Sequence, residues 1–300
     1  MSLPTLVMAA GLGTRLDPLT RLLAKPAVPL GDRTLIEHVF AWLRRHDVHD
    51  AVVNLHHRPA TVTAVLGDGA HLGMSVRYSW EQPLLGSAGG PRRALPLLAS
   101  EHFLIVNGDT LSNLDLGEMI DAHHRSGADV TMAVIPNTAP DRYNGVVLDG
   151  DRVTGFVPRG HAAGSWHFVG VQVVRSCVFG HLPDDVPSET VAGLYRDIVA
   201  NSPGRLLGWW ANSTFLDVGT PLDYLRAAQA DTANPAAAMK TVVWPSATVS
   251  GDARLEECVV IGGVHIPAGF SATRAVLAHP SIVKSTDQVE VRDGVAIFPM

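Results

Sequence analysis

The sequence predicts an α/β protein: a three-layer domain on a mixed, mostly parallel sheet, followed by a short β-rich segment. Two observations support this prediction. Short apolar runs alternate with segments of helical periodicity over the first half of the chain, as in strands joined by crossover helices. After residue 240, apolar residues recur at intervals of about six, a spacing typical of stacked β coils.

The predicted elements of the first domain can be placed in order. Apolar and β-branched runs predict strands over residues 6–10, 51–55, 74–79, 103–106 and 130–135. Apolar residues with a period near 3.6 predict helices over residues 35–45, 59–66, 91–98 and 116–124. The chain then becomes β-rich, which predicts an antiparallel extension built from residues 143–147, 152–156 and 167–174. Two more helices are expected over residues 191–201 and 222–231.

The C-terminal segment carries an imperfect hexapeptide repeat. Its apolar positions are Val243, Val249, Leu255, Ile261, Ile266 and Ala272. The repeat predicts a short β-helix of about three coils, with an irregular β-rich tail as the alternative. Because Asn234-Pro-Ala-Ala-Ala has the composition of a linker, we expect two domains, at residues 1–233 and 240–300.

Composition excludes several classes of partner. The formal net charge of −6 argues against nucleic acid and against an anionic membrane surface, which attract basic proteins. We find no basic leader before the first apolar run, and no apolar run approaches the ~18 residues of a membrane helix. Two distant cysteines form no metal spacing and no disulfide framework. We therefore expect a cytoplasmic protein, for which a mononucleotide remains a compatible ligand.

A glycine turn after the first strand predicts a polyphosphate site. Gly11 and Gly13 let the backbone approach a ligand and direct several N–H groups at it. Arg15 and Lys25 then supply positive charge for phosphate oxygens. Leu16 stands where a dinucleotide fingerprint needs its third glycine, and no Gly-Lys-Ser/Thr run closes a Walker A loop. Both of those better-known loops are therefore excluded.

At this point the chain resembles a known family. Gly11-Leu-Gly-Thr-Arg-Leu-Asp-Pro-Leu-Thr, with Lys25-Pro26-Ala-Val-Pro29, is similar to the signature of the sugar-1-phosphate nucleotidylyltransferases, or nucleoside-diphosphate-sugar pyrophosphorylases. Later landmarks follow in that family's order: Leu85-Gly-Ser-Ala-Gly-Gly90, Asn107-Gly-Asp109 and Asp217-Val-Gly-Thr-Pro221. The resemblance covers residues 1–230 and implies a Rossmann-like nucleotidyltransferase domain. Several members also carry a C-terminal left-handed β-helix, which the segment after residue 240 resembles.

The resemblance implies roles for the residues of the first turn. Arg15 and Lys25 correspond to the family's essential basic residues and are the expected catalytic pair. The expected nucleotide-binding residues of this turn are Ala10, Gly11, Gly13, Thr14 and Arg15, of which the last four are the expected phosphate contacts.

Two aspartates predict a Mg²⁺ site. Asp109 and Asp217 each follow an apolar strand. A Mg²⁺ that bridges phosphates takes one or two carboxylates and several waters. The resemblance assigns the two residues this role, and the alternative is that each caps a neighbouring turn.

The second glycine-rich stretch resembles the family's base-binding loop. Gly86, Ser87 and Gly89 are the expected contacts, because glycines let the backbone approach a base edge. Glu81 precedes this loop. If its acceptor-only carboxylate faces the base, guanine is favoured, since guanine offers N1–H and N2–H donors.

The sugar side departs from the family pattern. Gly145 and Gly170 match family positions near the sugar. The family usually shows Phe-x-Glu-Lys-Pro, whose Glu and Lys hold the sugar and its phosphate. Here the run is Phe156-Val-Pro158-Arg159, so Arg159 can replace the lysine but no carboxylate replaces the glutamate.

These observations predict an enzyme that transfers a nucleotidyl group from an NTP to a sugar 1-phosphate with Mg²⁺. The loop and the tail resemble guanylyltransferases acting on mannose 1-phosphate, so GTP is favoured and UTP comes next. Residues 66–79 are also similar to uridylyltransferases acting on N-acetylmuramic acid 1-phosphate, which usually lack the tail. A catalytically weak regulatory or binding subunit of the same fold is the third alternative. A homo-oligomer is possible.

Overall fold

The computed structural model describes residues 3–230 and 241–300, so the linker predicted at residues 234–238 lies outside the described residues. The chain divides by its internal contacts into two compact units. The first comprises Met1–Gly11 and His38–Phe215, and the second comprises Leu12–Glu37 and Leu216–Met300. The sequence predicts that the first domain ends near residue 233. The division by contacts instead groups residues 12–37 with the C-terminal segment.

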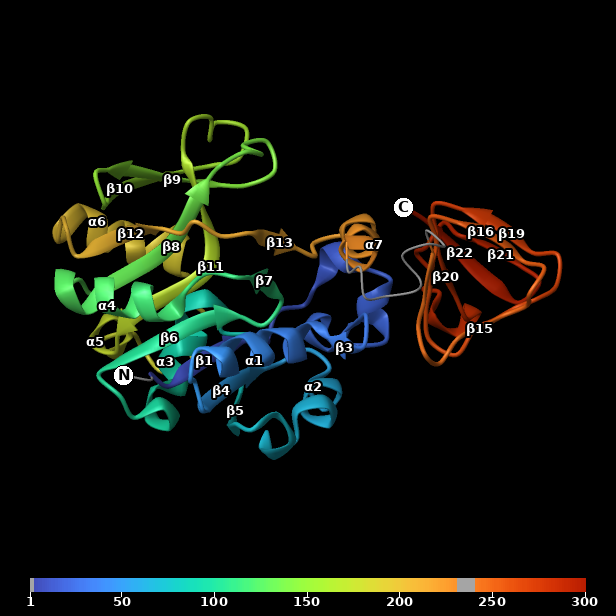
Figure 1. The fold of residues 1–300 in the computed structure, drawn as a ribbon, viewed down its shortest axis with the longest axis horizontal. Coiled ribbons are helices and arrows are strands. Elements are labelled where there is room, and N and C mark those ends of the chain that lie inside the picture. Colours follow the sequence, from blue (N-terminus) through green and yellow to red (C-terminus); the bar gives the residue numbers. More distant parts are fainter. Residues whose placement is uncertain (1–2, 231–240) are drawn as a thin grey trace. The chain divides into compact units, whose positions relative to one another are not determined.

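A nine-stranded sheet is the centre of the first unit (Figure 1). Its order is β5-β4-β1-β6-β11-β8-β12-β10-β9. The strands are β1 (Thr5–Met8), β4 (Asp50–Leu55), β5 (Ser75–Trp80), β6 (His102–Asn107), β8 (Val130–Pro136), β9 (Gly145–Asp149), β10 (Arg152–Val157), β11 (Trp166–Arg175) and β12 (Leu206–Trp210). A short strand, β7 (Thr110–Ser112), follows β6.

The predicted mixed sheet is correct, but parallel pairing does not dominate throughout. Strands β5, β4, β1 and β6 are parallel neighbours. Strand β11 runs antiparallel between β6 and β8, and β10 runs antiparallel between β12 and β9. The β-rich middle of the chain therefore extends the same sheet by antiparallel pairing, which needs no crossover helix.

Helices flank this sheet (Figure 1). They are α1 (Leu35–Arg45), α2 (Pro59–Leu66), α3 (Gly86–Leu98), α4 (Leu116–Ser126), α5 (Cys177–Gly180) and α6 (Tyr195–Asn201), with a π-helical turn, Thr190–Leu194, before α6. Helices α3, α5 and α6 share one buried cluster with the strands, which includes Phe103, Phe179 and Tyr195. The hydroxyl of Tyr195 is buried and donates a hydrogen bond of 2.6 Å to Gln172 of β11.

Helix α3 begins five residues earlier than the periodicity predicts. The sequence predicts a helix from Pro91, but the chain is helical from Gly86. The first turn forms because its N–H groups have partners elsewhere in the chain: Ala88 and Gly89 donate to the carbonyl of Ser188, at 2.8 and 3.3 Å. Such partners replace the intrahelical acceptors that a helix N-terminus lacks. The glycine-rich stretch is therefore the start of a helix.

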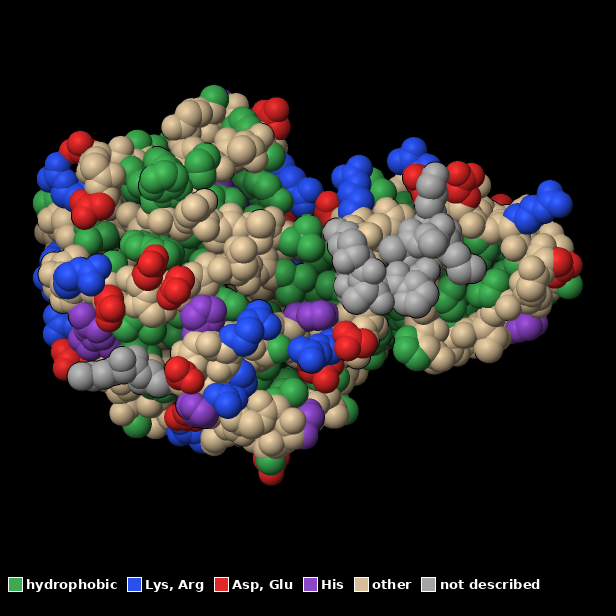
Figure 2. Space-filling view, viewed as in Figure 1, with side chains coloured by type: hydrophobic (Ala, Val, Ile, Leu, Met, Phe, Trp, Pro, Cys, Tyr) green, Lys and Arg blue, Asp and Glu red, His purple; other side chains and the backbone are tan. Residues whose placement is uncertain are grey.

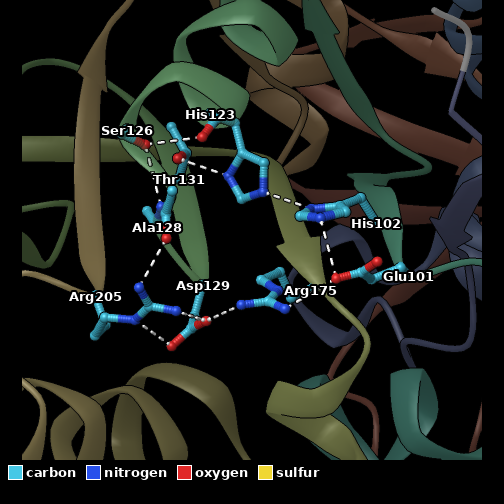
Figure 3. Close-up of polar contacts among 10 residues, drawn as sticks. Glu101, His102, His123, Ser126, Ala128, Asp129, Thr131, Arg175 and Arg205 are labelled. Carbon is cyan, nitrogen blue, oxygen red and sulfur yellow. Dashed lines mark hydrogen bonds and ion pairs between the residues drawn. The ribbon is translucent and has the colours of Figure 1, made fainter.

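A histidine pair connects α4 to the sheet (Figure 3). Nδ1 of His123 lies 2.9 Å from the hydroxyl of Thr131 on β8, and Nε2 lies 2.9 Å from Nδ1 of His102 on β6. Next to this pair runs a chain of ion pairs (Figure 3), formed by Glu101, Arg175, Asp129 and Arg205.

The second unit contains three short turns, a helix and the C-terminal strands. The turns are η1 (Thr14–Leu16), η2 (Leu19–Arg21) and η3 (Lys25–Ala27), followed by the hairpin of β2 (Pro29–Leu30) and β3 (Arg33–Thr34). Strand β13 (Phe215–Asp217) leads into helix α7 (Pro221–Ala230). The hydroxyl of Tyr224 in α7 donates to the carbonyl of Pro29 at 2.6 Å and accepts from the indole of Trp244 at 3.0 Å.

The C-terminal strands pair in parallel with strands 17 residues later. The chain contains β14 (Val242–Val243), β15 (Thr248–Val249), β16 (Arg254–Glu256), β17 (Val259–Val260), β18 (His265–Ile266), β19 (Ser271–Thr273) and β20 (Ala275–Ala278), then η7 (Pro280–Ile282) and the antiparallel strands β21 (Glu290–Arg292) and β22 (Val295–Pro299). Val242 pairs with Val259, Thr248 with His265, and Arg254 with Ser271. Val243, which the repeat includes among its apolar positions, is 42% exposed.

Figure 2 shows acidic and basic side chains interspersed over the visible face of the molecule. This distribution agrees with the small net negative charge of the sequence. Within the described residues, no helix combines the length and the apolar character needed to cross a membrane.

Candidate active site

The loop that follows Gly11 folds back on itself through Gly13. Gly13 has a positive φ of 63°, and a Cβ at this position would lie 2.8 Å from Cγ2 of Thr20 and 3.1 Å from Cβ of Lys25. The Thr20 hydroxyl donates to the Gly13 carbonyl at 3.2 Å, which holds the fold-back. Only glycine combines this backbone conformation with this approach. Gly13 therefore brings the Lys25 backbone next to the turn that Thr14 and Arg15 begin.

Arg15 and Lys25 both lie beside Asp217. Nη1 of Arg15 is 4.0 Å from one carboxylate oxygen of Asp217, and Nζ of Lys25 is 3.8 Å from the other. The Arg15 side chain is 62% exposed, whereas those of Lys25 and Asp217 are 11% and 15% exposed. Three of the predicted site residues, distant in sequence, thus form one charged cluster, with Arg15 positioned to reach a ligand from solvent.

The glycine after Asp217 leaves room for this cluster. A Cβ on Gly219 would lie 3.0 Å from Oδ2 of Asp217 and 3.1 Å from Nη1 of Arg15. The next residues start α7 with a capping arrangement, in which Asp223 accepts hydrogen bonds from the N–H and the hydroxyl of Thr220, at 3.0 and 2.8 Å. This arrangement fixes the direction in which the chain leaves Asp217.

In the first unit, Ala10, Gly11 and Asp109 follow two neighbouring parallel strands. Met8 at the end of β1 pairs with Asn107 at the end of β6. Ligands of α/β sheets bind at such carboxyl ends of strands. Gly11 is exposed, and a Cβ there would meet no protein atom within 4 Å. Packing of the described chain therefore does not require glycine at position 11.

The donor chemistry of the two aspartates fits Mg²⁺. Asp109 is half-buried at the end of β6, and Asp217 ends β13. In residues 3–230 and 241–300, no three or more His, Cys, Asp or Glu side chains are arranged to hold a metal ion by themselves. Mg²⁺ does not need such a cage, because phosphate oxygens and waters complete its coordination around one or two carboxylates. Each aspartate, taken by itself, therefore has the donor chemistry that Mg²⁺ takes.

The residues of the predicted base loop are packed against the segment 186–190. A Cβ on Gly86 would lie 2.7 Å from the Ser188 carbonyl oxygen, and one on Gly89 would lie 2.7 Å from that of Val186. The Ser87 hydroxyl donates to Glu189 at 2.5 Å and accepts from the N–H of Thr190 at 2.8 Å. The glycines are thus explained by the close approach of another backbone, a reason that the sequence does not reveal.

Glu81 is buried behind this loop. Its side chain is 3% exposed, Oε1 accepts from the amide of Asn54 at 2.7 Å, and Oε2 accepts from the N–H of Leu85 at 2.8 Å. Burial raises the pKa of the Glu81 carboxyl, and the hydrogen bonds from Leu85 and Asn54 oppose that rise. This burial argues against the predicted contact between Glu81 and a nucleobase. Asn54 was missed by the sequence analysis, although it is a polar residue in an otherwise apolar strand.

The predicted sugar-side glycines are both sterically required. A Cβ on Gly145 would lie 2.1 Å from the Ser165 hydroxyl oxygen. Gly170 has a φ of 79° at an irregularity in β11, and a Cβ there would lie 2.3 Å from the Asn107 amide nitrogen. Arg159 is exposed, and its backbone N–H donates to Asn144 at 3.0 Å.

An aromatic cluster near Gly145 was also missed by the sequence analysis. The rings of Tyr143 and His167 stack with centroids 4.1 Å apart, and the ring of Phe215 lies 5.1 Å from that of His167. The three residues are 24 or more positions apart in sequence, so no local pattern signals them.

The structure shows an α/β fold with a glycine turn after β1 and, in the second unit, a charged cluster of Arg15, Lys25 and Asp217. A family model described as nucleotidyl transferase matches residues 4–234, and the chain belongs to this family. It is therefore a nucleotidyltransferase.

Individual relatives are more distant. The chain is 26% identical to a mannose-1-phosphate guanylyltransferase of Mycobacterium tuberculosis, over 88% of this chain and 81% of the relative. It is 27% identical to a D-glycero-alpha-D-manno-heptose 1-phosphate guanylyltransferase of Aneurinibacillus thermoaerophilus, over 74% of this chain and 95% of the relative. The crystal structure of HddC from Yersinia pseudotuberculosis complexed with GMP-PN shares the fold, with a TM-score of 0.66 and 19% identity, over 76% of this chain and 99% of that one.

Proposed function

We propose that this enzyme transfers a nucleotidyl group from an NTP to a sugar 1-phosphate, releasing pyrophosphate. The observation that carries the proposal is the cluster of Arg15, Lys25 and Asp217, which joins two cations to a carboxylate suited to Mg²⁺. Family membership supports the transfer, and the names of the relatives support a sugar 1-phosphate as acceptor.

The reaction asks little of the protein beyond positioning and charge. A sugar 1-phosphate is ionised at neutral pH, so its oxygen attacks the α-phosphorus without a general base. Arg15 and Lys25 neutralise charge on the phosphates and on the leaving pyrophosphate. Mg²⁺, for which Asp109 and Asp217 are the proposed ligands, would supply further charge neutralisation when bound. The result is a direct displacement in which the phosphate–pyrophosphate bond breaks as the new phosphate–phosphate linkage forms.

We further propose GTP and mannose 1-phosphate as the preferred substrates. Relatives named as guanylyltransferases support this choice. Because the Glu81 carboxylate is directed into the protein, Glu81 gives no support for guanine.

We also propose that the segment after residue 240 is a short left-handed β-helix, which the parallel pairing of strands 17 residues apart supports. Such a short segment is suited to packing between subunits, and we propose a cytoplasmic homo-oligomer.

One observation favours the alternative of a regulatory or binding subunit. Pro158 and Arg159 occupy the place of the family's Glu-Lys pair, and both are exposed. Neither residue carries a carboxylate that could hold sugar hydroxyls. Arg15, Lys25, Asp109 and Asp217 favour the active enzyme.

Pyrophosphate release, measured with each of four NTPs against a panel of sugar 1-phosphates, tests the proposal. We expect release with GTP and mannose 1-phosphate. A preference for UTP with N-acetylmuramic acid 1-phosphate would replace the proposed substrates but not the reaction. Nucleotide binding without release from any pair would establish the binding subunit instead.

A further inference from the structure

Three hydrogen bonds connect the start of the glycine turn after β1, here called the phosphate turn (residues 9–13), to the start of α3. The N–H of Ala9 donates to Oδ1 of Asn54 at 2.6 Å, and Nδ2 of Asn54 donates to Oε1 of Glu81 at 2.7 Å. The N–H of Leu85 then donates to Oε2 of Glu81 at 2.8 Å. Ala9 follows β1, Asn54 belongs to β4, and Glu81 follows β5, so the connection crosses three adjacent parallel strands.

Each polar group in this connection has a fixed role. Since the backbone N–H of Ala9 can only donate, the side-chain oxygen of Asn54 must face this N–H, and the side-chain NH₂ of Asn54 must face Glu81. Glu81 receives donors on both oxygens, which a carboxylate satisfies and a side-chain amide cannot. Asn54 is fully buried and Glu81 nearly so, which makes an unmatched group at either position costly.

Gly90 shows that the surrounding structure is built around these two side chains. A Cβ on Gly90 would lie 2.6 Å from Oε1 of Glu81 and 2.9 Å from Nδ2 of Asn54. Helix α3 can pass over the pair only because residue 90 has no side chain. The pair therefore fixes the distance between the turn at Ala10–Gly11 and the turn at Leu85–Gly86.

We infer that Asn54 and Glu81 are positioning residues for nucleotide binding, which hold the phosphate turn and the first turn of α3 in register. This inference rests on the proposed function, because it takes both turns to contact the nucleotide. A direct contact between Glu81 and the base would distinguish one NTP from another. A positioning role of the two side chains affects the binding of every NTP alike.

Exchanging the two side-chain types provides the test. In Glu81→Gln, an amide NH₂ faces either the Leu85 N–H or the Asn54 amide, and one buried hydrogen bond is lost. We expect kcat/KM to fall by about 10-fold to 100-fold, through a raised KM for the nucleotide and by the same factor for GTP and UTP. The KM for the sugar 1-phosphate should stay within about 2-fold. Asn54→Asp, which places two carboxylates face to face, should lower the Tm as well.

The double variant Asn54→Asp, Glu81→Gln should restore the wild-type pattern. The carboxylate introduced at position 54 would accept from Ala9 and from the amide introduced at position 81. The carbonyl oxygen of that amide would accept from Leu85, so every donor again meets an acceptor. We expect the nucleotide KM to return to within about 3-fold of wild type and the Tm to within a few degrees. Glu118→Gln, the same change on an exposed side chain of α4, serves as the matched control.

Two results would overturn the inference. Unequal loss for GTP and UTP in Glu81→Gln would show a base contact, and a double variant no better than the worse single variant would show that the pair does not act as a unit. If wild type releases no pyrophosphate, the proposed function fails, and the same variants are compared by their Kd for GTP and UTP from calorimetry. Equal weakening of both Kd values with recovery in the double variant would still support the inference.

Discussion

Arg21, in the loop that bears Arg15 and Lys25, and Asp287 near the C-terminus form an ion pair across 266 positions of sequence. Nη2 of Arg21 also lies 3.1 Å from Oδ1 of Asp287, and Nη1 donates to the carbonyl of Ile282 at 3.0 Å. The Arg21 guanidinium lies 5.1 Å from the ring centroid of Phe298 and pairs with Asp17 on its other side. The loop that bears Arg15 and Lys25 is therefore anchored to the C-terminal strands.

Removing this anchor should destabilise the protein. The Arg21 side chain is 9% exposed, and Arg21→Met would leave Asp17 and Asp287 without their shared cation. We expect a loss of about 3 kcal/mol in the free energy of unfolding, measured by denaturant titration. The control is Arg152→Met, whose ion pair with Asp149 is exposed and should change stability by less than about 0.5 kcal/mol. Equal effects of the two variants would contradict an anchoring role.

Gly11 and Gly13 should respond differently to alanine. Gly13→Ala should cost about 2 kcal/mol, because its φ is positive and the new Cβ would crowd Thr20. Gly11→Ala should leave the Tm unchanged, since a Cβ there meets no protein atom within 4 Å. If a phosphate occupies that space, the same variant should raise the KM for the NTP by about 10-fold. Thermal denaturation and steady-state kinetics of the two variants check this prediction. An unchanged KM in Gly11→Ala would remove Gly11 from the nucleotide site.

The structure shows which features local sequence can determine. The bounds of α1 and α2 agree with the predicted ranges, because apolar periodicity and a helix-starting proline are local signals. The start of α3 could not be predicted, because its first N–H groups bond to Ser188, about 100 residues away. The direction of Glu81 likewise depends on Asn54, and the grouping of residues 12–37 with the C-terminal segment involves contacts such as that of Arg21 with Asp287. Each of these features arises from contacts that no local pattern encodes.

Arg15 and Lys25 should both be needed for the reaction, and Arg15 should not be needed for the fold. Arg15→Met should lower kcat by at least about 100-fold, as removal of a single charge-stabilising donor commonly does. Because the Arg15 side chain is 62% exposed, the Tm should change little. Lys25→Met should show a similar loss of kcat, and Arg33→Met, an exposed cation on β3, is the control. Near-normal pyrophosphate release from Arg15→Met would show that Arg15 is not required for the reaction.

Asp217 should control the response to metal. If Asp217 binds Mg²⁺ as proposed, Asp217→Asn removes an anionic oxygen ligand, and the Mg²⁺ concentration for half-maximal activity should rise by about 10-fold or more. Chelation by EDTA should abolish activity in wild type, and added Mg²⁺ should restore it. Asp151→Asn, a carboxylate in an exposed turn, is the matched control. An unchanged Mg²⁺ requirement in Asp217→Asn would assign Asp217 only to holding Arg15 and Lys25.

His123 should make the fold sensitive to mild acid. Burial, followed by the nearby His102 and His124, lowers the pKa of His123 to about 4. Figure 3 shows His102 beside His123. Between that value and the unfolded value near 6.5, the unfolded chain binds a proton that the folded chain does not, so stability falls as pH decreases through this range. The loss from this group is on the order of 3 kcal/mol.

The variant His123→Gln tests this dependence. It should be less stable than wild type at pH 8, because glutamine cannot reproduce the hydrogen bonds to both Thr131 and His102. Its stability should nevertheless fall less than that of wild type between pH 6.5 and pH 4, because it carries no group that must be protonated on unfolding. Denaturant titrations of both proteins at several pH values give the two slopes. Equal slopes would show that His123 is not the group that couples folding to pH in this range, and the lowered pKa of His102 would then make that residue the next to substitute.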